Sequence, residues 1–419
     1  MSVMRRIFIF IFLGFLCGAV VILYVGPKSR KAVIIPNRSQ VEVKQTNWRR
    51  NDSLFTFIHV SNKSRNTNKL LPVQSRSCRP KKHFVFVKTH KCSSTTLASL
   101  LRKYALDYNL TMALPLKPVV PRLLFTQSLG FPDVVSRKDI YRIGEMERRG
   151  IPLETSYFHQ RFDLNTWKSV MPPDTVYLAV LREPLDQLRS AIGYMGILGE
   201  HFKGPVQQKI YDFYSDPKAK HFYFKHRHTT YSWTKSFMAF TLGLVPQNAS
   251  MDVAERYLQE ADGVFDLVLL TEYLFESIVL LRRRMCWTIR DVVFMRLNSE
   301  VKEGMKYPEE LYKKSRAWNT VDHLFYDHFE KKLLRDISNE DNFQEELEHF
   351  KEVNYNVNRF CEQVTANGPP PFIVPGSDWN EEFTFAKKDC DTLKARPDGE
   401  GVTDAMRKRL DKTIDTWPV

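Results

Sequence analysis

One stretch of the chain combines the residue types that bind a multiply charged anion. Lys88–Thr96 reads Lys-Thr-His-Lys-Cys-Ser-Ser-Thr-Thr, so two lysines, a histidine and five hydroxyls fall within nine residues. A short apolar run, His83–Val87, precedes this segment, and residues at helical spacing follow it as far as Asn109. A helix that begins after such a turn presents unpaired N–H groups and a positive dipole end. We call Lys88–Thr96 the basic loop and predict that it binds an anion; an ordinary polar turn is the alternative.

A second candidate anion site lies further along the chain. Arg182 ends the apolar run Thr175–Leu181, and Ser190 follows eight residues later in an expected helix. At that spacing a guanidinium and a hydroxyl can hold one phosphate. Sites at the ends of two adjacent strands suit a nucleotide with phosphates on both its 5′ and 3′ sides. The basic loop lacks the glycines of a nucleoside triphosphatase loop, and no magnesium-binding aspartate follows nearby, so we predict no metal.

The elements around these residues alternate between strand and helix. Apolar runs predict buried strands at 83–87, 175–181, 265–270 and 292–297, with shorter candidates at 140–143 and 155–158. A charged helix is expected over about 340–364, followed by a weakly patterned tail. This alternation predicts an α/β fold, a parallel sheet with helices on both faces. Such sheets bind ligands at the carboxyl ends of strands, where Lys88, His159 and Arg182 fall.

The N-terminal segment predicts a membrane anchor. Residues 7–25 are apolar or small, and as a helix they would span about 28 Å, enough to cross a bilayer. A cleaved signal peptide is the competing interpretation, but no clear small-x-small cleavage site follows. Acceptor sequences for N-glycosylation crowd the next segment and recur later, at Asn37, Asn51, Asn62, Asn109 and Asn248. We therefore expect a cytoplasmic tail (1–6), a transmembrane signal-anchor (7–25), a lumenal stem (26–80), a catalytic domain (81–340) and a C-terminal helical extension (341–419).

Charge and cysteine content narrow the class of partner. The 419 residues carry a net charge of +14, which implies an acidic partner. No run of five or more basic residues occurs, so nucleic-acid binding is not supported. Five of the six cysteines follow residue 25 and allow at most two disulfides. Cys92 is the one that we least expect to be bridged.

These motifs resemble those of the Golgi sulfotransferases, and specifically the galactose 3-O-sulfotransferase family, which includes galactosylceramide sulfotransferase. The family's 5′-phosphosulfate motif, approximately KTHKTASST, stands here as the basic loop, and its 3′-phosphate motif matches Arg182 and Ser190 in LREPLDQLRSAIGYMG. Residues 265–287 and 315–329 and the segment VVFMRLN add to the similarity, which covers roughly 83–335 and is poor beyond about 365. The chain departs from the family at Cys92-Ser93, usually Thr-Ala, and at Phe158, usually Asn.

The resemblance implies a P-loop-like sulfotransferase fold with 3′-phosphoadenosine 5′-phosphosulfate as donor and no metal. The donor would be bound by Arg182, Ser190 and the residues of the basic loop, which are Lys88, Thr89, His90, Lys91, Cys92, Ser93, Ser94, Thr95 and Thr96. The acceptor would be the 3-hydroxyl of a β-galactose on a glycolipid or a glycoprotein glycan. The resemblance also implies a type II protein of the Golgi membrane with a lumenal catalytic domain, and a homodimer is compatible with it.

The expected mechanism is attack by the acceptor hydroxyl on sulfur, in line with the departing phosphate oxygen. Lys88 would neutralise the charge that develops on that oxygen. The hydroxyl needs a base, and histidine suits the pH of the Golgi. We favour His159 as the base and assign His90 to the sulfuryl group, although the two roles could be exchanged.

Three alternative functions remain open at this point. A lumenal kinase would need a divalent metal and ATP. A sulfotransferase that acts on a glycosaminoglycan would need a long basic groove. A non-catalytic lumenal protein that binds a nucleotide or a glycan would not need an intact site. The sequence also leaves open whether the galactose is on ceramide, an N-glycan or a mucin-type chain.

Overall fold

The structure is a computed structural model that describes residues 41–50, 53–62, 78–116, 128–199, 201–218, 231–297, 307–364 and 370–418. The chain divides into two units, residues 1–71 and 72–419. In the first unit, β1 (Val41–Arg50) pairs antiparallel with β2 (Ser53–Asn62). The predicted anchor at 7–25 lies outside the described residues, and no helix within them is long and apolar enough to cross a bilayer.

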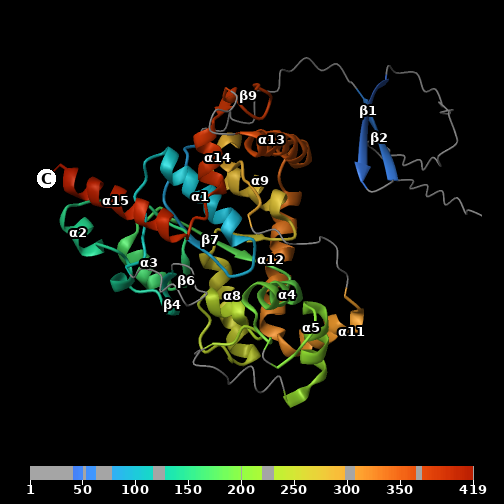
Figure 1. Cartoon of the computed structure of the whole chain (residues 1–419), viewed down its shortest axis with the longest axis vertical. Helices are drawn as coiled ribbons and strands as arrows, with labels where there is room; N and C mark the ends of the chain where they lie inside the picture. Colours follow the sequence, from blue (N-terminus) through green and yellow to red (C-terminus); the bar gives the residue numbers. More distant parts are fainter. Residues whose placement is uncertain are drawn as a thin grey trace, which may run out of the picture. The chain divides into compact units, whose positions relative to one another are not determined.

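The second unit is built on a parallel sheet of four strands (Figure 1). The order across the sheet is β5 (Thr155–Ser156), β3 (Phe84–Val87), β7 (Val176–Leu181) and β8 (Leu267–Leu270), and every pairing is parallel. All residues of β3 and β8 are buried, as expected for strands covered on both faces. The predicted α/β fold is confirmed, and the strands that precede Lys88 and Arg182 are neighbours.

Helices flank this sheet. A helix follows each central strand: α1 (Ser94–Asp107) follows β3, α4 (Pro184–Met195) follows β7 and α9 (Leu274–Met285) follows β8. Pro184 occupies the first turn of α4, where its missing N–H costs no hydrogen bond. Figure 1 shows α1 and α9 above the sheet and α8 (Met251–Val264) below it. Further helices are α3 (Leu164–Val170), α5 (Val206–Ser215), α7 (Phe237–Thr241), α11 (Glu309–Trp318) and α12 (Thr320–Ser338).

Two of the predicted strands are wrong. Ile140 makes one isolated bridge to Pro115, and Ile143 already begins α2 (Ile143–Arg148). In the run 292–297, Val292 ends α10 (Ile289–Val292) and the residues after it form no strand. The backbone N–H of Phe294 donates to Asn354 Oδ1 at 2.9 Å. A side chain thus takes the hydrogen bond that a neighbouring strand would otherwise provide, and a short apolar run cannot reveal this.

The predicted strand at 155–158 is shorter than expected, and a separate strand follows it. β5 ends at Ser156, and β6 (His159–Arg161) begins a separate two-stranded sheet. In that sheet β6 pairs parallel with β4 (Ser128–Val134). His159 therefore lies within a strand, where its backbone is fixed by pairing with Ser128.

The C-terminal segment is more ordered than the predicted tail. After α13 (Phe343–Gln363), the antiparallel strands β9 (Phe372–Val374) and β10 (Phe383–Phe385) lead to α14 (Lys387–Lys394) and α15 (Glu400–Thr416). A disulfide between Cys361 and Cys390 joins α13 to α14, and a second joins Cys78 to Cys286. Cys92 is free and buried. This pattern agrees with the expected upper limit of two bridges and with an unpaired Cys92.

The turn between α14 and α15, residues 395–399, is held against α1. Ser99 Oγ donates to the Leu393 carbonyl at 2.8 Å, and Arg102 Nη2 donates to the Ala395 carbonyl at 3.1 Å. Because α1 begins at the basic loop, these contacts bring residues near the end of the chain to the first motif of the sequence.

Candidate active site

The basic loop forms a turn at the end of β3 whose backbone geometry suits an anion. Lys91 and Ser93 both have left-handed backbone conformations, with φ of 63° and 53°. Ser93 precedes α1, no side chain caps this helix, and its first turn holds no acidic residue. A loop with alternating backbone handedness turns successive N–H groups to one side, and the helix dipole adds positive potential there. The predicted anion site therefore has the expected local geometry.

Lys88 lies at the centre of a buried cluster of charged and polar groups. Its side chain is 1% exposed, and Nζ is 2.7 Å from His159 Nε2 and 2.9 Å from Asp398 Oδ2. His159 Nδ1 is 2.6 Å from the Lys88 carbonyl oxygen. A carbonyl only accepts, so Nδ1 carries the proton and Nε2 accepts from the ammonium group. Burial lowers the pKa of Lys88, whereas the charge of Asp398 acts to raise it.

Two histidines stack beside this lysine. The ring centroids of His90 and His159 are 3.6 Å apart and the planes differ by 15°. Burial lowers the pKa of His90 to about 3, and the charge of Lys88 contributes. Burial also holds the pKa of His159 well below its usual range, with further lowering from His90 and Lys88. Both rings are therefore neutral, and His159 Nε2 can accept a proton once Lys88 moves from it.

Asp398 is the counter-ion of Lys88 and was not predicted. The residue is 2% exposed, and its other oxygen, Oδ1, accepts from Arg396 Nε at 2.8 Å. Burial opposes the charged carboxylate, but Lys88 and Arg396 together lower the pKa of Asp398 below its usual range. The turn 395–399 thus places one carboxylate between two cations at the edge of the basic loop.

The second predicted anion site lies at the end of β7. Arg182 Nη1 donates to the Lys91 carbonyl at 3.2 Å, which joins this site to the basic loop. Arg182 Nε is 3.9 Å from Glu272 Oε1 and makes no hydrogen bond within the described part of the chain. Ser190 is half-buried on α4, and its hydroxyl likewise has no partner among the described residues. A cation and a hydroxyl are therefore available to a ligand.

Lys91 connects the two sites. Its ammonium lies 3.5 Å from the centroid of the Tyr194 ring, and Arg396 Nη1 donates to the Tyr194 hydroxyl at 2.9 Å. Burial lowers the pKa of Lys91 to about 8, and the charges of Lys88, Arg182 and Arg396 add to the effect. These four cations are close enough to repel one another, and an anionic ligand would relieve that repulsion.

The remaining residues of the basic loop divide into two groups. Thr89 Oγ1 is buried without a hydrogen-bond partner in the described structure, and Thr95 Oγ1 is 3.5 Å from Lys88 Nζ. Ser93 and Ser94 form the junction with α1. By contrast, Thr96 Oγ1 accepts from the Leu297 N–H at 3.0 Å, and Cys92 Sγ lies 3.7 Å from Met238 Sδ. The side chains of Thr96 and Cys92 are therefore engaged within the protein.

Several other polar positions of the chain have structural roles or lie elsewhere. Asn319 Oδ1 accepts from the Ser236 N–H at 2.6 Å, and Asp322 accepts from the N–H groups of Met238 and Ala239. Both side chains thus stabilise the start of α7. Of the glycosylation sequences, Asn109 and Asn248 are exposed, Asn62 ends β2, and Asn37 and Asn51 fall outside the described residues.

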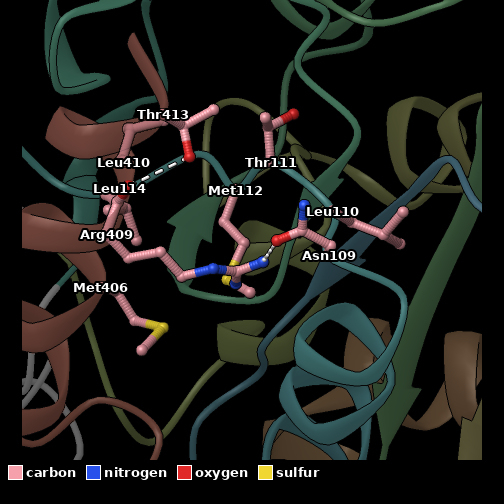
Figure 2. Close-up of a pocket in the computed structure, with 9 residues that line it drawn as sticks. All are labelled: Asn109, Leu110, Thr111, Met112, Leu114, Met406, Arg409, Leu410 and Thr413. Atoms are coloured by element: carbon pink, nitrogen blue, oxygen red, sulfur yellow. Dashed lines mark hydrogen bonds between the residues drawn. The ribbon is translucent and has the colours of Figure 1, made fainter. Parts of the chain in front are cut away.

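A small pocket lies apart from the strand ends. Figure 2 shows it between the segment 109–114 and α15, where Arg409 Nη2 donates to Asn109 Oδ1 at 2.5 Å. Neither the basic loop nor Arg182 lines this pocket. The residues whose chemistry suits a nucleotide phosphate are those at the ends of β3 and β7.

Arg396 and Asp398 are the residues of this cluster that sequence reasoning missed. They lie in the sequence Arg-Pro-Asp-Gly, which is typical of a turn. This signal predicts a turn but not its location, because Asp398 is separated from Lys88 by 310 positions.

Comparisons with known proteins agree with this site. The sequence profile of the galactose-3-O-sulfotransferase family matches residues 54–367. The chain is 34% identical to galactose-3-O-sulfotransferase 2 of Homo sapiens over 259 residues, 61% of this chain and 61% of that protein. It is 30% identical to galactose-3-O-sulfotransferase 3 of Bos taurus over 276 residues, 64% and 60% of the two chains. It is 26% identical to galactosylceramide sulfotransferase of Bos taurus over 289 residues, 68% and 65%.

The matches thus span about three fifths of the length of the first two relatives. The family profile covers both the basic loop and the segment with Arg182 and Ser190, and these residues form one connected site at the carboxyl ends of adjacent parallel strands. The chain belongs to the galactose-3-O-sulfotransferase family.

Proposed function

We propose that this protein transfers the sulfuryl group of 3′-phosphoadenosine 5′-phosphosulfate to the 3-hydroxyl of a β-galactose residue. The supporting observation is the pair of cationic sites, around Lys88 and Arg182, at the ends of two adjacent parallel strands. Membership of the family supports the reaction, and the names of the relatives, galactose-3-O-sulfotransferases and a galactosylceramide sulfotransferase, support galactose as the acceptor.

The side chains present fit this donor. Its 5′-phosphosulfate would lie at the uncapped start of α1 with Lys88 and Lys91, and its 3′-phosphate at Arg182 and Ser190. His90 Nδ1, Thr89 Oγ1 and Arg182 Nε are buried and have no hydrogen-bond partner among the described residues. Buried polar atoms seldom lack a hydrogen-bond partner, so three such atoms at one site indicate that a ligand binds there.

The chemistry then divides between the donor and the protein. When bound, the donor supplies the sulfuryl group and a phosphate leaving group: a bond forms between the galactose oxygen and sulfur, and the bond from sulfur to phosphate oxygen breaks with its electron pair left on phosphate. His159 Nε2 accepts the proton of the attacking hydroxyl. The Lys88 ammonium stabilises the charge on the leaving oxygen. His90, which is 6% exposed and packs beside Phe131 and Trp233, contacts the sulfuryl group.

The choice of His159 as base follows from its protonation. A lowered pKa keeps the ring neutral even in an acidic compartment. His159 Nε2 already contacts Lys88, so base and leaving-group cation are adjacent. His90 is the alternative base, because its Nδ1 is free of partners in the described structure.

We further propose a type II protein of the Golgi membrane, anchored by residues 7–25, with a galactose-bearing glycolipid or glycan as partner. Two disulfides in the second unit are consistent with an oxidising lumen. Antibody access to the C-terminus only after Golgi vesicles are permeabilised would support this topology. Access in intact vesicles would overturn it. A homodimer also remains part of the proposal, and light scattering of the purified protein would test it.

The decisive experiment measures transfer of labelled sulfate to a panel of acceptors: galactosylceramide, lactose-type glycans and core-1 glycans. We expect Lys88→Met and His159→Gln to abolish most transfer. His349→Gln, which removes a histidine bonded to Asn380 away from the site, should retain it. Transfer that stays high in both active-site variants would refute the mechanism. Phosphate transfer from ATP with a divalent metal would favour a kinase, and sulfation of a glycosaminoglycan alone would favour that acceptor. Donor binding without transfer to any acceptor would indicate a non-catalytic protein.

A further inference from the structure

We propose that Asp398 is a positioning residue that holds Lys88 on His159 in the free protein and pairs with protonated His159 after Lys88 moves to the donor. This inference rests on the proposed function, because it assigns a partner to each proton and charge of that reaction. It concerns a residue beyond the 54–367 segment that the family profile matches.

The first step of the argument is that the proposed base is occupied in the free protein. Lys88 Nζ donates to His159 Nε2 at 2.7 Å, and this nitrogen is the one that has no proton of its own. A hydroxyl cannot use Nε2 while the ammonium holds it. The same ammonium is the cation assigned to the leaving oxygen. Movement of Lys88 toward the donor therefore performs two functions, since it supplies charge there and frees the base.

The second step concerns the charge that Lys88 leaves behind. Asp398 Oδ2 is 2.9 Å from Lys88 Nζ and 3.7 Å from His159 Nε2. The charged and titratable groups that face His159 are Lys88, His90, Asp398 and Arg396. Asp398 is the one anion in that set. When Nε2 takes a proton, the carboxylate is therefore placed to stabilise the imidazolium, in a buried site where water cannot do so.

The third step is that the position of Asp398 is fixed independently of Lys88. Arg396 Nε binds Oδ1, and the turn 395–399 is held on α1 by Ser99 and Arg102. α14 is also joined to α13 by the disulfide between Cys361 and Cys390. The Asp398 carboxylate therefore keeps its position when Lys88 moves away. This fixed position allows it to exchange Lys88 for protonated His159.

The proposal predicts opposite effects of one substitution on binding and on turnover. Asp398→Asn removes a negative charge that competes with the anionic ligand for Lys88, so adenosine 3′,5′-bisphosphate should bind about threefold to tenfold more tightly. The same change removes the partner of protonated His159, so kcat should fall at least about tenfold. In the pH profile of kcat, the acidic limb should move to lower pH, because protonated His159 loses the stabilising charge of the Asp398 carboxylate.

Calorimetry of the full-length protein with adenosine 3′,5′-bisphosphate measures the first effect without any acceptor. The matched control is Asp404→Asn, which removes an exposed carboxylate paired with Arg407 on α15 and should change neither binding nor turnover. Asp398→Glu restores the charge and should return bisphosphate affinity to nearly that of the wild type, with part of kcat. If Asp398→Asn does not fold, a comparison of Asp398→Glu with the wild type still tests the proposal, because kcat should fall while affinity does not.

The outcomes are distinguishable. Weaker bisphosphate binding together with lower turnover in Asp398→Asn would show a structural role and overturn the proposal. Unchanged binding and turnover would also overturn it. If the wild type sulfates no galactoside, the proposed function fails, yet the calorimetric comparison still decides whether Asp398 competes with an anion for Lys88.

Discussion

The ends of β3 and β7 differ in how their cations are neutralised. At the end of β3, Lys88 is enclosed and bound by both His159 and a carboxylate. At the end of β7, Arg182 binds one carbonyl and lies 3.9 Å from Glu272, and the nearby Ser190 is half-buried without a described partner. An anion that reaches Lys88 must replace a hydrogen-bonded carboxylate, whereas one that reaches Arg182 meets a cation that makes no hydrogen bond with its carboxylate partner, Glu272.

This difference predicts a division of labour between the two sites. When Lys88 exchanges Asp398 for a ligand anion, one ion pair replaces another, so ligand binding gains little free energy. Lys88 should therefore contribute mainly to the rate, as charge develops on the leaving oxygen in the transition state. Arg182 lies at the other end of the nucleotide, where charge does not change during transfer, and it should bind ground state and transition state equally. The end of β3 should therefore govern kcat, and the end of β7 should govern affinity.

The largest expected effect is that of Lys88→Met on turnover. Loss of the cation at the leaving oxygen should lower kcat about a thousandfold, the size typical of one preorganised electrostatic contact. The Kd of adenosine 3′,5′-bisphosphate should change less than about tenfold, because Asp398 keeps Arg396 as a partner. Sulfate transfer at saturating donor and calorimetry measure the two quantities. Equal losses in both would remove the proposed division of labour.

The complementary change is Arg182→Met. A charge-assisted hydrogen bond contributes about 2 kcal/mol, so the Kd of the bisphosphate should rise about thirtyfold. At saturating donor, kcat should stay within about threefold of the wild type. Arg137→Met, which removes an exposed arginine paired with Glu147, is the control and should alter neither value. A drop in kcat comparable to that of Lys88→Met would mean that Arg182 also acts on the reacting bond.

Lys91 gives a pH test of the connection between the two ends. Its pKa in the free protein is lowered to about 8 by burial and by Lys88, Arg182 and Arg396. The protonated form attracts the anion, so affinity is full below this pKa and is lost as pH rises through it. Between pH 7 and pH 9 the Kd of the bisphosphate should increase about tenfold.

Two lysine-to-arginine substitutions test whether Lys91 causes this pH dependence. Lys91→Arg keeps the charge throughout this range and should flatten the profile. Lys412→Arg, on an exposed position of α15, should leave the profile as it is. An identical slope in the wild type and in Lys91→Arg would assign the dependence to another group.

Local pattern was sufficient to predict most of the elements that carry this candidate site. The strand, polar turn and helix around Lys88, and the strand, proline and helix around Arg182, are each encoded within about thirty neighbouring residues. Their adjacency follows from the general behaviour of parallel sheets. The apolar run 292–297 shows the limit of this approach, since the side chain of Asn354 rather than a strand takes its backbone hydrogen bond.

Asp398 shows a different limit. Its contact with Lys88 depends on a disulfide, on two hydrogen bonds from α1 and on the direction of a turn, and none of these leaves a periodic pattern in the sequence. Lys88 belongs to the basic loop, which was recognisable by its composition. Its partner Asp398 is a single carboxylate in a turn, and its role becomes visible only when the chain is folded.

The smallest expected effect concerns Cys92, the unusual residue of the basic loop. Its side chain is fully buried, with Sγ 3.4 Å from the His90 carbonyl and 3.7 Å from Met238 Sδ. The same carbonyl accepts from Gln187 Nε2 of α4 at 3.3 Å, so Cys92 packs where the two strand ends are joined. Burial raises the pKa of the Cys92 thiol well above its usual range, so the group is neutral and unreactive.

Cys92→Ala should therefore change packing rather than chemistry. We expect the free energy of unfolding to fall by about 1 kcal/mol, since one small buried group is lost. Turnover and bisphosphate affinity should each stay within about twofold of the wild type. Denaturation, transfer assays and alkylation of the folded protein measure these effects. Rapid alkylation of Cys92, or a tenfold loss of turnover in the variant, would place the thiol in contact with the ligand. The two strand ends would then share a third ligand-binding group, and the division between rate at β3 and affinity at β7 would no longer hold.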